Sequence, residues 1–396
     1  MRRAISIFLV FAALLTLFGC ADQKGGGDIM ENSNYSAFAE SPRTYNEGAG
    51  EAWTLANTYN CLNTKKQFNV AYIGGSVTVG SGSSKGNSWR ELTTSWLKSS
   101  YPQATVNEIY AAVGGTGSMW GLFRLEEDVL AYNPDLVFIE FCINDGYEFF
   151  SETESAAFAD AMIRKINEHN AETDIVLVFT TDEGYVGKDF ANKMGYRKVA
   201  EYYGVPYIDA GDALAKEIKQ TGNNWRYYVR DWAHPNDNGY RVYYNEVERC
   251  LEQWLSDAKA QTPKPHKLNE TPAVTNSLQV VKRLEPSELN YDENWRLDDT
   301  PKMSIGNASV LEARKSGAKI TLEFEGTQIG YIYYGKENSE IKVTIDGSNE
   351  KIIAGEKGMK TLSEKIMYDN LSNGKHTLVI EYIGPGYFSL GALFIG

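Results

Sequence analysis

The chain has 396 residues, of which 42% are hydrophobic and 23% charged, and its formal net charge is −13. This composition excludes a disordered or collagen-like chain, and the length predicts two domains. An acidic protein without a basic helix or zinc finger lacks the Lys and Arg that neutralise phosphates, so we exclude nucleic acid as a partner.

The N-terminus has the pattern of an export signal. Arg2 and Arg3 precede an apolar run over residues 4–18, which is too short to span a bilayer comfortably. The run ends in Leu-Phe-Gly-Cys, which resembles the lipobox of bacterial lipoproteins, although an ordinary secretory signal or a buried helix would share much of the pattern. The resemblance implies cleavage before Cys20 and acylation of its thiol, which would anchor the protein to the membrane.

This resemblance implies a signal peptide over residues 1–19 and an exported bacterial lipoprotein, held at the membrane or cell surface. Residues 20–48 are rich in Gly, Ser, Asn and Glu, which predicts a flexible tether.

In residues 49–260, short apolar runs alternate with amphipathic segments. Strands that are apolar on both faces, alternating with helices, predict a parallel sheet covered on both sides, which is a three-layer α/β/α fold of the flavodoxin-like kind. The expected strands are 68–73, 106–112, 136–141, 175–179 and 205–208, and the expected helices are 89–98, 119–132, 154–170, 190–203 and 238–258.

The residue composition changes after residue 260. Residues 261–276 hold three prolines among polar residues, which predicts a linker. Residues 277–396 show alternating apolar and polar positions separated by Asp-Gly and Asn-Gly turns, which predicts an antiparallel β-sandwich.

Three cysteines besides Cys20 are present, and none has the spacing of a metal site, so no metal is expected. Because three is odd, at least one is unpaired within the chain. Cys61 and Cys250 flank the first domain, and whether they form a disulfide stays open.

A carboxylate and an imidazole lie three residues apart in Asp231-Trp232-Ala233-His234. A serine would complete the parts of a nucleophilic triad, which is recognised by role and geometry. Ser76 follows two glycines directly after an expected strand, where ligands of parallel sheets bind. The segment lacks the lysine of a P-loop and the second glycine of the Gly-x-Ser-x-Gly elbow.

Four blocks in order resemble the SGNH (GDSL-like) hydrolase family, and specifically its carbohydrate acetylesterases. They are Gly74-Gly75-Ser76, with glycine in place of aspartate, residues 112–116 with Gly114-Gly115, Cys142-Ile143-Asn144-Asp145, with cysteine in place of glycine, and residues 231–234. The resemblance implies that Ser76 is the nucleophile, His234 the general base and acid, and Asp231 the residue that orients His234. It also implies an oxyanion hole made by the backbone N–H groups of Ser76 and Gly115 and the Asn144 amide.

Aromatic residues occur in the same loops. Trp120, Tyr147 and Trp232 could stack on sugar rings, although core packing would explain each of them as well. The second domain resembles a galactose-binding-like, carbohydrate-binding jelly roll, which could bind sugar or brace the hydrolase.

The sequence therefore predicts an exported serine esterase that removes acetyl groups from carbohydrate, its substrate partner, without any cofactor. Three alternatives stay open: a lipase or thioesterase on the same fold, an acyltransferase, and a surface lipoprotein that binds carbohydrate without catalysis. The polysaccharide and the hydroxyl position are not specified by the sequence.

Overall fold

The computed structural model describes residues 43–275, 278, 282–300, 309–335, 339–354, 362–369, 371–386 and 388–396. The expected signal peptide 1–19, Cys20 and residues 21–42 of the expected tether lie outside these residues. Across the described part of the chain, no helix has the length and apolar character needed to span a membrane. The described residues all belong to one compact unit.

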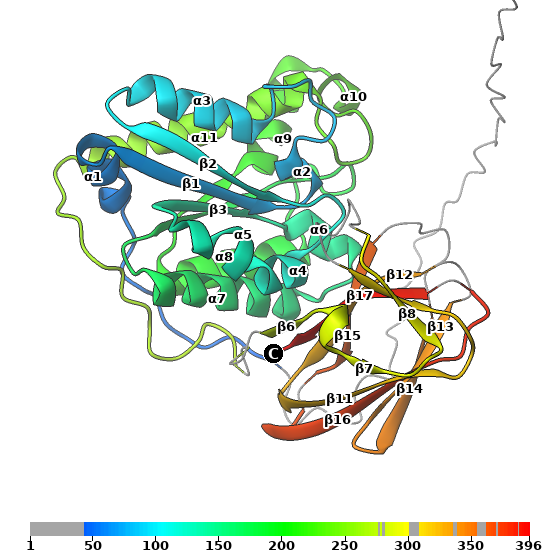
Figure 1. Ribbon diagram of the computed structural model, residues 1–396. Coiled ribbons are helices and arrows are strands. Elements are labelled where there is room, and N and C mark those ends of the chain that lie inside the picture. The colour runs from blue at the N-terminus through cyan, green and yellow to red at the C-terminus, as the bar shows by residue number, and fades with distance from the viewer. Residues whose placement is uncertain are drawn as a thin grey trace, which may run out of the picture. The chain divides into compact units, whose positions relative to one another are not determined.

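A parallel sheet of five strands, in the order β2-β1-β3-β4-β5, forms the centre of the N-terminal region (Figure 1). Every residue of β3 and β4 is buried, as expected for strands covered on both faces. The strands are β1 (Gln67–Gly74), β2 (Thr105–Ala112), β3 (Leu136–Glu140), β4 (Asp174–Phe179) and β5 (Tyr207–Asp209).

Helices cover both faces of this sheet (Figure 1). One face carries α1 (Ala56–Thr64), α3 (Trp89–Ser100), α9 (Ala210–Thr221) and α11 (Asp237–Ala258), and the other carries α4 (Ser118–Phe123), α5 (Leu125–Asp128), α7 (Glu152–His169) and α8 (Ala191–Tyr203). The shorter elements are α2 (Ser76–Val79), η1 (Leu130–Tyr132), α6 (Cys142–Tyr147) and α10 (Trp225–Tyr228).

The structure differs from expectation in three helices. The helix expected over residues 119–132 is three short pieces, α4, α5 and η1, because the chain leaves helical geometry at Arg124 and Val129. Nearly all side chains of α4 are buried, so packing on both sides and not helical periodicity determines its path. Helices α1 and α9 were not expected from the sequence; α9 begins where the Asp209 side chain accepts a hydrogen bond from Asp212 N.

The C-terminal region consists of antiparallel strands in two sheets that enclose an apolar core. One sheet has the order β15-β12-β17-β10-β8, with β6 also paired to β17, and the other has the order β14-β13-β16-β11-β7. The bounds are β6 (Lys282–Leu284), η2 (Pro286–Glu288), β7 (Asn290–Tyr291), β8 (Trp295–Asp298), β10 (Val310–Ala313), β11 (Ala318–Gly326), β12 (Ile329–Gly335), β13 (Glu340–Ile345), β14 (Ser348–Ala354), β15 (Leu362–Tyr368), β16 (Gly374–Tyr382) and β17 (Phe388–Ile395). The expected fold class, a parallel α/β sheet followed by a β-sandwich, is confirmed.

The two regions share one apolar cluster. Phe394 of the sandwich stacks on Phe123 with ring centroids 4.5 Å apart and also contacts Trp120 of α4. The segment between the regions is held along the N-terminal region, where His266 Nε2 lies 2.6 Å from Asp174 Oδ1 and the His266 ring stacks on Trp53. The hydrophobic core is therefore continuous across the boundary.

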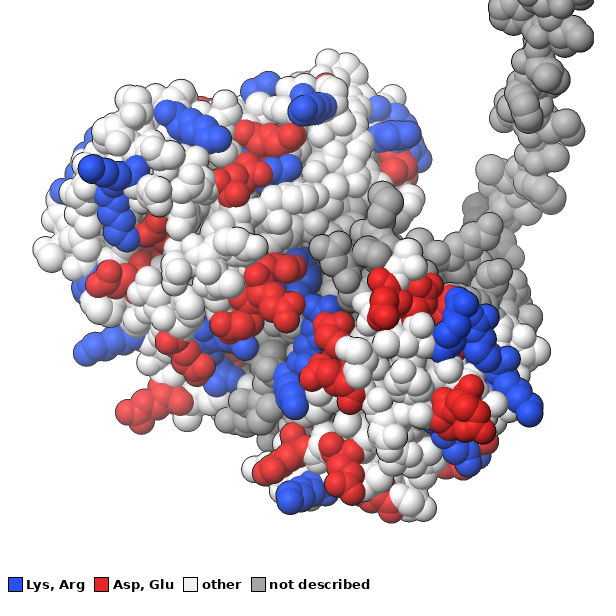
Figure 2. All heavy atoms as spheres, in the orientation of Figure 1, with Lys and Arg blue, Asp and Glu red and all other residues white. Residues whose placement is uncertain are grey.

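The three described cysteines, Cys61, Cys142 and Cys250, are buried and free, so Cys61 and Cys250 form no disulfide in this structure. On the face shown in Figure 2, acidic and basic side chains are interspersed, and the described residues there form no continuous basic surface.

Candidate active site

Ser76, His234 and Asp231 lie in hydrogen-bond contact although 158 positions separate the serine from the histidine. Ser76 Oγ is 2.9 Å from His234 Nε2, and His234 Nδ1 is 2.8 Å from Asp231 Oδ2. All three side chains are only partly buried, so a reactant can reach them from solvent. This is the order of contacts that activates a serine hydroxyl through an oriented imidazole.

The turn that carries Ser76 forms because β1 ends in two glycines and the chain enters the single helical turn α2. Gly80 closes that turn in the left-handed region, at φ 94°, where a residue without Cβ is least strained. From α11, the Tyr240 hydroxyl donates to Val77 O at 3.1 Å and Ser81 O at 3.0 Å. The turn that carries Ser76 is thus held in place by α11, the helix that follows His234.

The loop that carries Asp231 and His234 is held by its own backbone. Asp231 Oδ1 accepts hydrogen bonds from Ala233 N at 3.0 Å and His234 N at 2.8 Å, and Arg230 N donates to His234 O at 2.8 Å. Burial raises the pKa of the Asp231 carboxyl, but the N–H donors of Ala233 and His234 outweigh it and lower that pKa to about 2. Asp231 therefore stays ionised at neutral pH and can stabilise a protonated His234.

Asn144 lies in α6, the short helix that follows β3. Its side chain is largely buried, and among the described residues the amide takes no hydrogen-bond partner. A Cβ at Gly75 would overlap this amide, coming within 2.6 Å of Asn144 Cγ. A side chain at position 75 would therefore have to displace the Asn144 amide from the position it occupies in this structure.

Gly114 and Gly115 follow β2 and lie beside the nucleophile. A Cβ at Gly114 would lie 3.7 Å from Ser76 Cβ, and Val113 N donates to Gly74 O at 3.0 Å. Gly115 is in the left-handed region, at φ 75°, and faces open space. The structure therefore brings the glycine block, Asn144 and Ser76 to one edge of the sheet.

Two buried carboxylates support these loops and were not assigned a catalytic role from the sequence. Glu140 accepts hydrogen bonds at 2.8 Å from both Thr78 Oγ1 and Thr180 Oγ1, and burial raises its pKa to about 7. Asp145 accepts from Ser118 N at 2.7 Å and Ser118 Oγ at 2.8 Å, and burial raises its pKa to about 6. Both hold backbone segments in place. Asp145 belongs to the motif block that contains Asn144, whereas Glu140 lies in no motif block and was missed by sequence reasoning.

The three aromatic residues predicted to stack on sugar differ in their exposure to solvent. Trp232 is 45% exposed and Tyr147 is 39% exposed, and their rings make an edge contact with centroids 4.2 Å apart. The prediction for Trp120 is wrong: it is 1% exposed and packs against Phe394, so it has no free face for a substrate. A tryptophan in an amphipathic segment can belong to the core or to a cleft, and only packing distinguishes the two.

A loop after β4 positions the exposed pair. Asp182 accepts hydrogen bonds from the Tyr147 hydroxyl and from Gly184 N at 2.8 Å, and Glu183 N donates to Trp232 O at 2.9 Å. Gly82 approaches the catalytic loop from the other side, since a Cβ there would lie 3.4 Å from His234 Cβ. These residues carry no motif and were missed by sequence reasoning.

Among the described residues, no other histidine contacts both a serine hydroxyl and a carboxylate. His169, His266 and His376 are each bonded to other residues, Asn133, Asp174 and Asp346 respectively. Across the ranges that the structure describes, no group of three or more His, Cys, Asp or Glu side chains is arranged to hold a metal ion.

Comparison with known proteins agrees with this geometry. Residues 72–242 match the model of the GDSL-like Lipase/Acylhydrolase family. No curated protein matches the chain in sequence. The fold is similar to the crystal structure of a two-domain esterase active on acetylated mannans, with a TM-score of 0.73 and 22% identity, covering 88% of this chain and 96% of that one.

A second structure, of a two-domain esterase active on acetylated mannans co-crystallised with mannopentaose, gives a TM-score of 0.74 at 22% identity, covering 89% of this chain and 98% of that chain. Both regions of the present chain are thus found together in one known architecture. Residues 72–242 match the GDSL-like Lipase/Acylhydrolase family, and this match supports a carboxylic ester hydrolase as the activity of this protein.

Proposed function

We propose that this protein is an exported serine esterase that removes O-acetyl groups from carbohydrate. The observation that carries the proposal is the unbroken contact from Ser76 Oγ through His234 to the Asp231 carboxylate. Such a chain of contacts makes a serine hydroxyl nucleophilic at neutral pH.

Acylation would begin with attack of Ser76 Oγ on the acetyl carbonyl carbon while His234 Nε2 takes the hydroxyl proton. The carbonyl oxygen becomes an oxyanion that accepts hydrogen bonds from Ser76 N, Gly115 N and the unpartnered Asn144 amide. The bond between the carbonyl carbon and the sugar oxygen then breaks, and His234 gives its proton to that oxygen. The products are the free sugar hydroxyl and an acetyl-serine.

Deacylation repeats these steps with water. His234 takes a proton from water, the resulting hydroxide attacks the acetyl carbon, and the bond to Ser76 Oγ breaks as the proton returns to that oxygen. Acetate is released and the serine is restored. Asp231, ionised because its pKa is lowered to about 2, stabilises the protonated His234 in both steps.

Two observations support carbohydrate as the substrate. The exposed rings of Trp232 and Tyr147 stand beside the catalytic loop, and aromatic faces stack on sugar rings. The structure with the same two-domain architecture belongs to an esterase active on acetylated mannans.

The first experiment measures acetate release from a panel of acetylated plant and bacterial glycans, with Ser76→Ala as the control. We expect the wild type to release acetate and the variant to lose essentially all activity. Acetate release that persists in Ser76→Ala would contradict the mechanism, and a wild type inactive on every ester would favour a protein that only binds carbohydrate.

A second experiment separates the acetylesterase from a lipase or an acyltransferase. Hydrolysis of p-nitrophenyl esters should decline beyond chains of about four carbons, because the loops after Ser76 are polar and rich in glycine and offer little apolar surface for a longer acyl chain. Preference for longer chains would identify a lipase, and transfer of acetate to an added sugar instead of water would identify a transferase.

We also propose that the protein acts outside the cytoplasm, anchored through Cys20, because a polysaccharide cannot enter the cytoplasm intact. In the bacterial host, the wild type should fractionate with membranes and Cys20→Ser should not. Equal membrane association of the two would refute the lipid anchor while leaving the esterase proposal intact.

A further inference from the structure

Glu364 of the sandwich reaches into the hydrolase region. It lies on β15, its residue is 1% exposed, and its carboxylate accepts hydrogen bonds from Gly117 N and, at 2.5 Å, from Trp120 N. The two donors belong to the start of α4, two residues beyond Gly115. The buried carboxylate of Glu364, in the sandwich, therefore binds the end of the loop that carries Gly115, an expected oxyanion donor of the N-terminal region.

This loop is held at both ends. At its start, Val113 N donates to Gly74 O at 3.0 Å, beside the nucleophile turn. At its end, Gly117 is enclosed: a Cβ there would lie 2.8 Å from Asp145 Oδ1 and 2.9 Å from Glu364 Oε1. Between these two points, Gly115 has no side chain and faces open space, so its orientation depends on where the ends are fixed.

Glu364 also contacts α6, the helix that carries Asn144, the other expected oxyanion donor. Glu364 N donates to Glu148 Oε2 at 3.3 Å, at the end of the helix that presents Asn144. Asp145, next to Asn144, accepts from Ser118 N at 2.7 Å. The glycine loop and the asparagine helix are therefore joined through a network whose members include Glu364.

We propose that Glu364 is a positioning residue for the oxyanion hole, and hence that the sandwich contributes to catalysis and does not serve only to bind sugar. This inference rests on the proposed serine mechanism, since it concerns the N–H groups that would stabilise its intermediates. Glu364 touches no reacting atom; it acts through the loop with Gly115 and the helix with Asn144.

The physical reason is the short helix α4, whose first N–H groups have no partner within the helix. Without Glu364 two of them would be buried unsatisfied, which favours a shift of the loop. Burial raises the pKa of Glu364, while the N–H donors of Gly117 and Trp120 favour its ionised form. Oxyanion donors act only within a narrow distance range, so a small loop shift reduces turnover.

The test compares Glu364→Gln with Glu312→Gln in the full protein, using p-nitrophenyl acetate so that sugar binding plays no part. Glutamine keeps the side-chain volume of Glu364, but its amide has one acceptor oxygen, so its NH2 group would face one of the two backbone N–H donors, Gly117 N or Trp120 N. Glu312 is a matched control, because it is a largely buried carboxylate of the same domain, paired with Arg296 at 2.7 Å and Arg314 at 2.9 Å. We expect Glu364→Gln to lower kcat and kcat/KM together by about 10-fold or more, and Glu312→Gln to change them less than about 2-fold.

A second variant and a double-mutant cycle distinguish a positioning role of Glu364 from a general loss of folding. Gly117→Ala perturbs the same contact from the hydrolase side and should reproduce the loss in kcat. In an Asn144→Ala background, Glu364→Gln should cost clearly less than in the wild type, because both act on the same oxyanion. Folded Glu364→Gln with wild-type kcat, or full additivity with Asn144→Ala, would overturn the inference.

Failure of the inference and failure of the proposed function give different results. If Ser76→Ala remains active, the serine mechanism itself is wrong. If Ser76→Ala is inactive and Glu364→Gln is as active as Glu312→Gln, the mechanism stands and only the role of Glu364 falls.

Discussion

Single residues around the nucleophile are constrained by contacts with residues distant in sequence. Gly75 is directly next to Ser76, yet a side chain there would overlap the Asn144 amide, 69 positions later in the chain. Likewise, Glu140 fixes Thr78 on the nucleophile turn and Thr180 after β4 through one buried carboxylate. Each contact ties the turn that carries Ser76 to a segment distant in sequence.

Gly75→Ala is expected to lower kcat by about 10-fold or more, because the added Cβ displaces the Asn144 amide from its place beside the oxyanion. The backbone at Gly75, at φ −88°, accepts alanine without strain, so folding should be preserved. Steady-state kinetics on p-nitrophenyl acetate measures the effect. Gly374→Ala, where a Cβ meets nothing within 4 Å, is the control, and equal kcat in the two variants would contradict the explanation.

Glu140→Gln is expected to change how stability depends on pH. Because the pKa of Glu140 is raised to about 7 from 4.5, the folded wild type holds a proton that the unfolded chain releases, and its stability falls as pH rises through that window. The variant should lack this component, at most about 3 kcal/mol. Denaturant unfolding at pH 4.5 and pH 7 gives the slopes; parallel slopes would mean that Glu140 does not titrate in this range.

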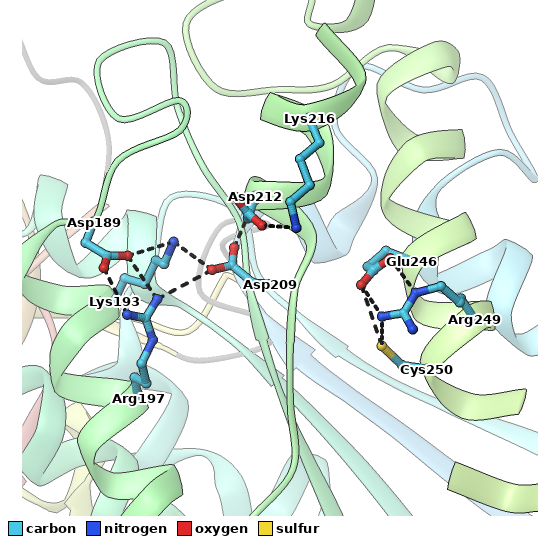
Figure 3. Close-up of polar contacts among 9 residues, drawn as sticks. All are labelled: Asp189, Lys193, Arg197, Asp209, Asp212, Lys216, Glu246, Arg249 and Cys250. Carbon is cyan, nitrogen blue, oxygen red and sulfur yellow. Dashed lines mark hydrogen bonds and ion pairs between the residues drawn. The ribbon is translucent and has the colours of Figure 1, made fainter. Parts of the chain in front are cut away.

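At the scale of elements, ion pairs connect α8 to the loops at the carboxyl ends of β4 and β5 (Figure 3). Lys193 of α8 lies between two carboxylates, with Nζ 2.7 Å from Asp209 Oδ2 and 3.1 Å from Asp189 Oδ1. Asp209 also begins α9, since it accepts a hydrogen bond from Asp212 N. A single lysine thus helps fix the ends of α8, β5 and α9.

Lys193→Met is expected to lower the free energy of unfolding by about 1–3 kcal/mol, because it removes the more buried of the two cations, Lys193 and Arg197, that pair with Asp189 and Asp209. Lys216→Met is the matched control: its pair with Asp212 is exposed on both sides, so its loss should change the free energy of unfolding much less than the loss of Lys193. Chemical denaturation of both variants decides the question. A control as destabilised as Lys193→Met would show that burial of the pair is not what matters.

At the scale of the whole molecule, one apolar cluster runs through both regions, and within it the sandwich packs against α4. Phe394 is fully buried against Phe123 and Trp120, so its ring serves both regions. Together with Glu364, it connects the second domain to the loops of the active site. The two alternatives considered for this domain, binding sugar and bracing the hydrolase, are therefore not exclusive.

Phe394→Ala is expected to cost about 3–5 kcal/mol and to shift the melting of both regions together, since the cavity opens in a shared core. Calorimetry of the full chain should show one transition with a lowered Tm. Ile352→Ala, at a site 62% exposed on β14, should leave Tm nearly unchanged. Two separate transitions, with only one moved by the Phe394 change, would show that the regions unfold independently.

The sequence by itself determined the fold class and the meeting of Ser76 with His234. Alternating apolar strands and helices, and glycines directly after strands, are local patterns, and parallel strands bring their carboxyl ends to one edge. Only the tertiary structure decided that Trp120 is core, that Gly75 makes room for Asn144, and that Glu364 closes the loop of Gly115. These depend on which surfaces pack together. The type and spacing of residues do not reveal such contacts, whether the partners lie 69 positions apart, as Gly75 and Asn144 do, or 247, as Gly117 and Glu364 do.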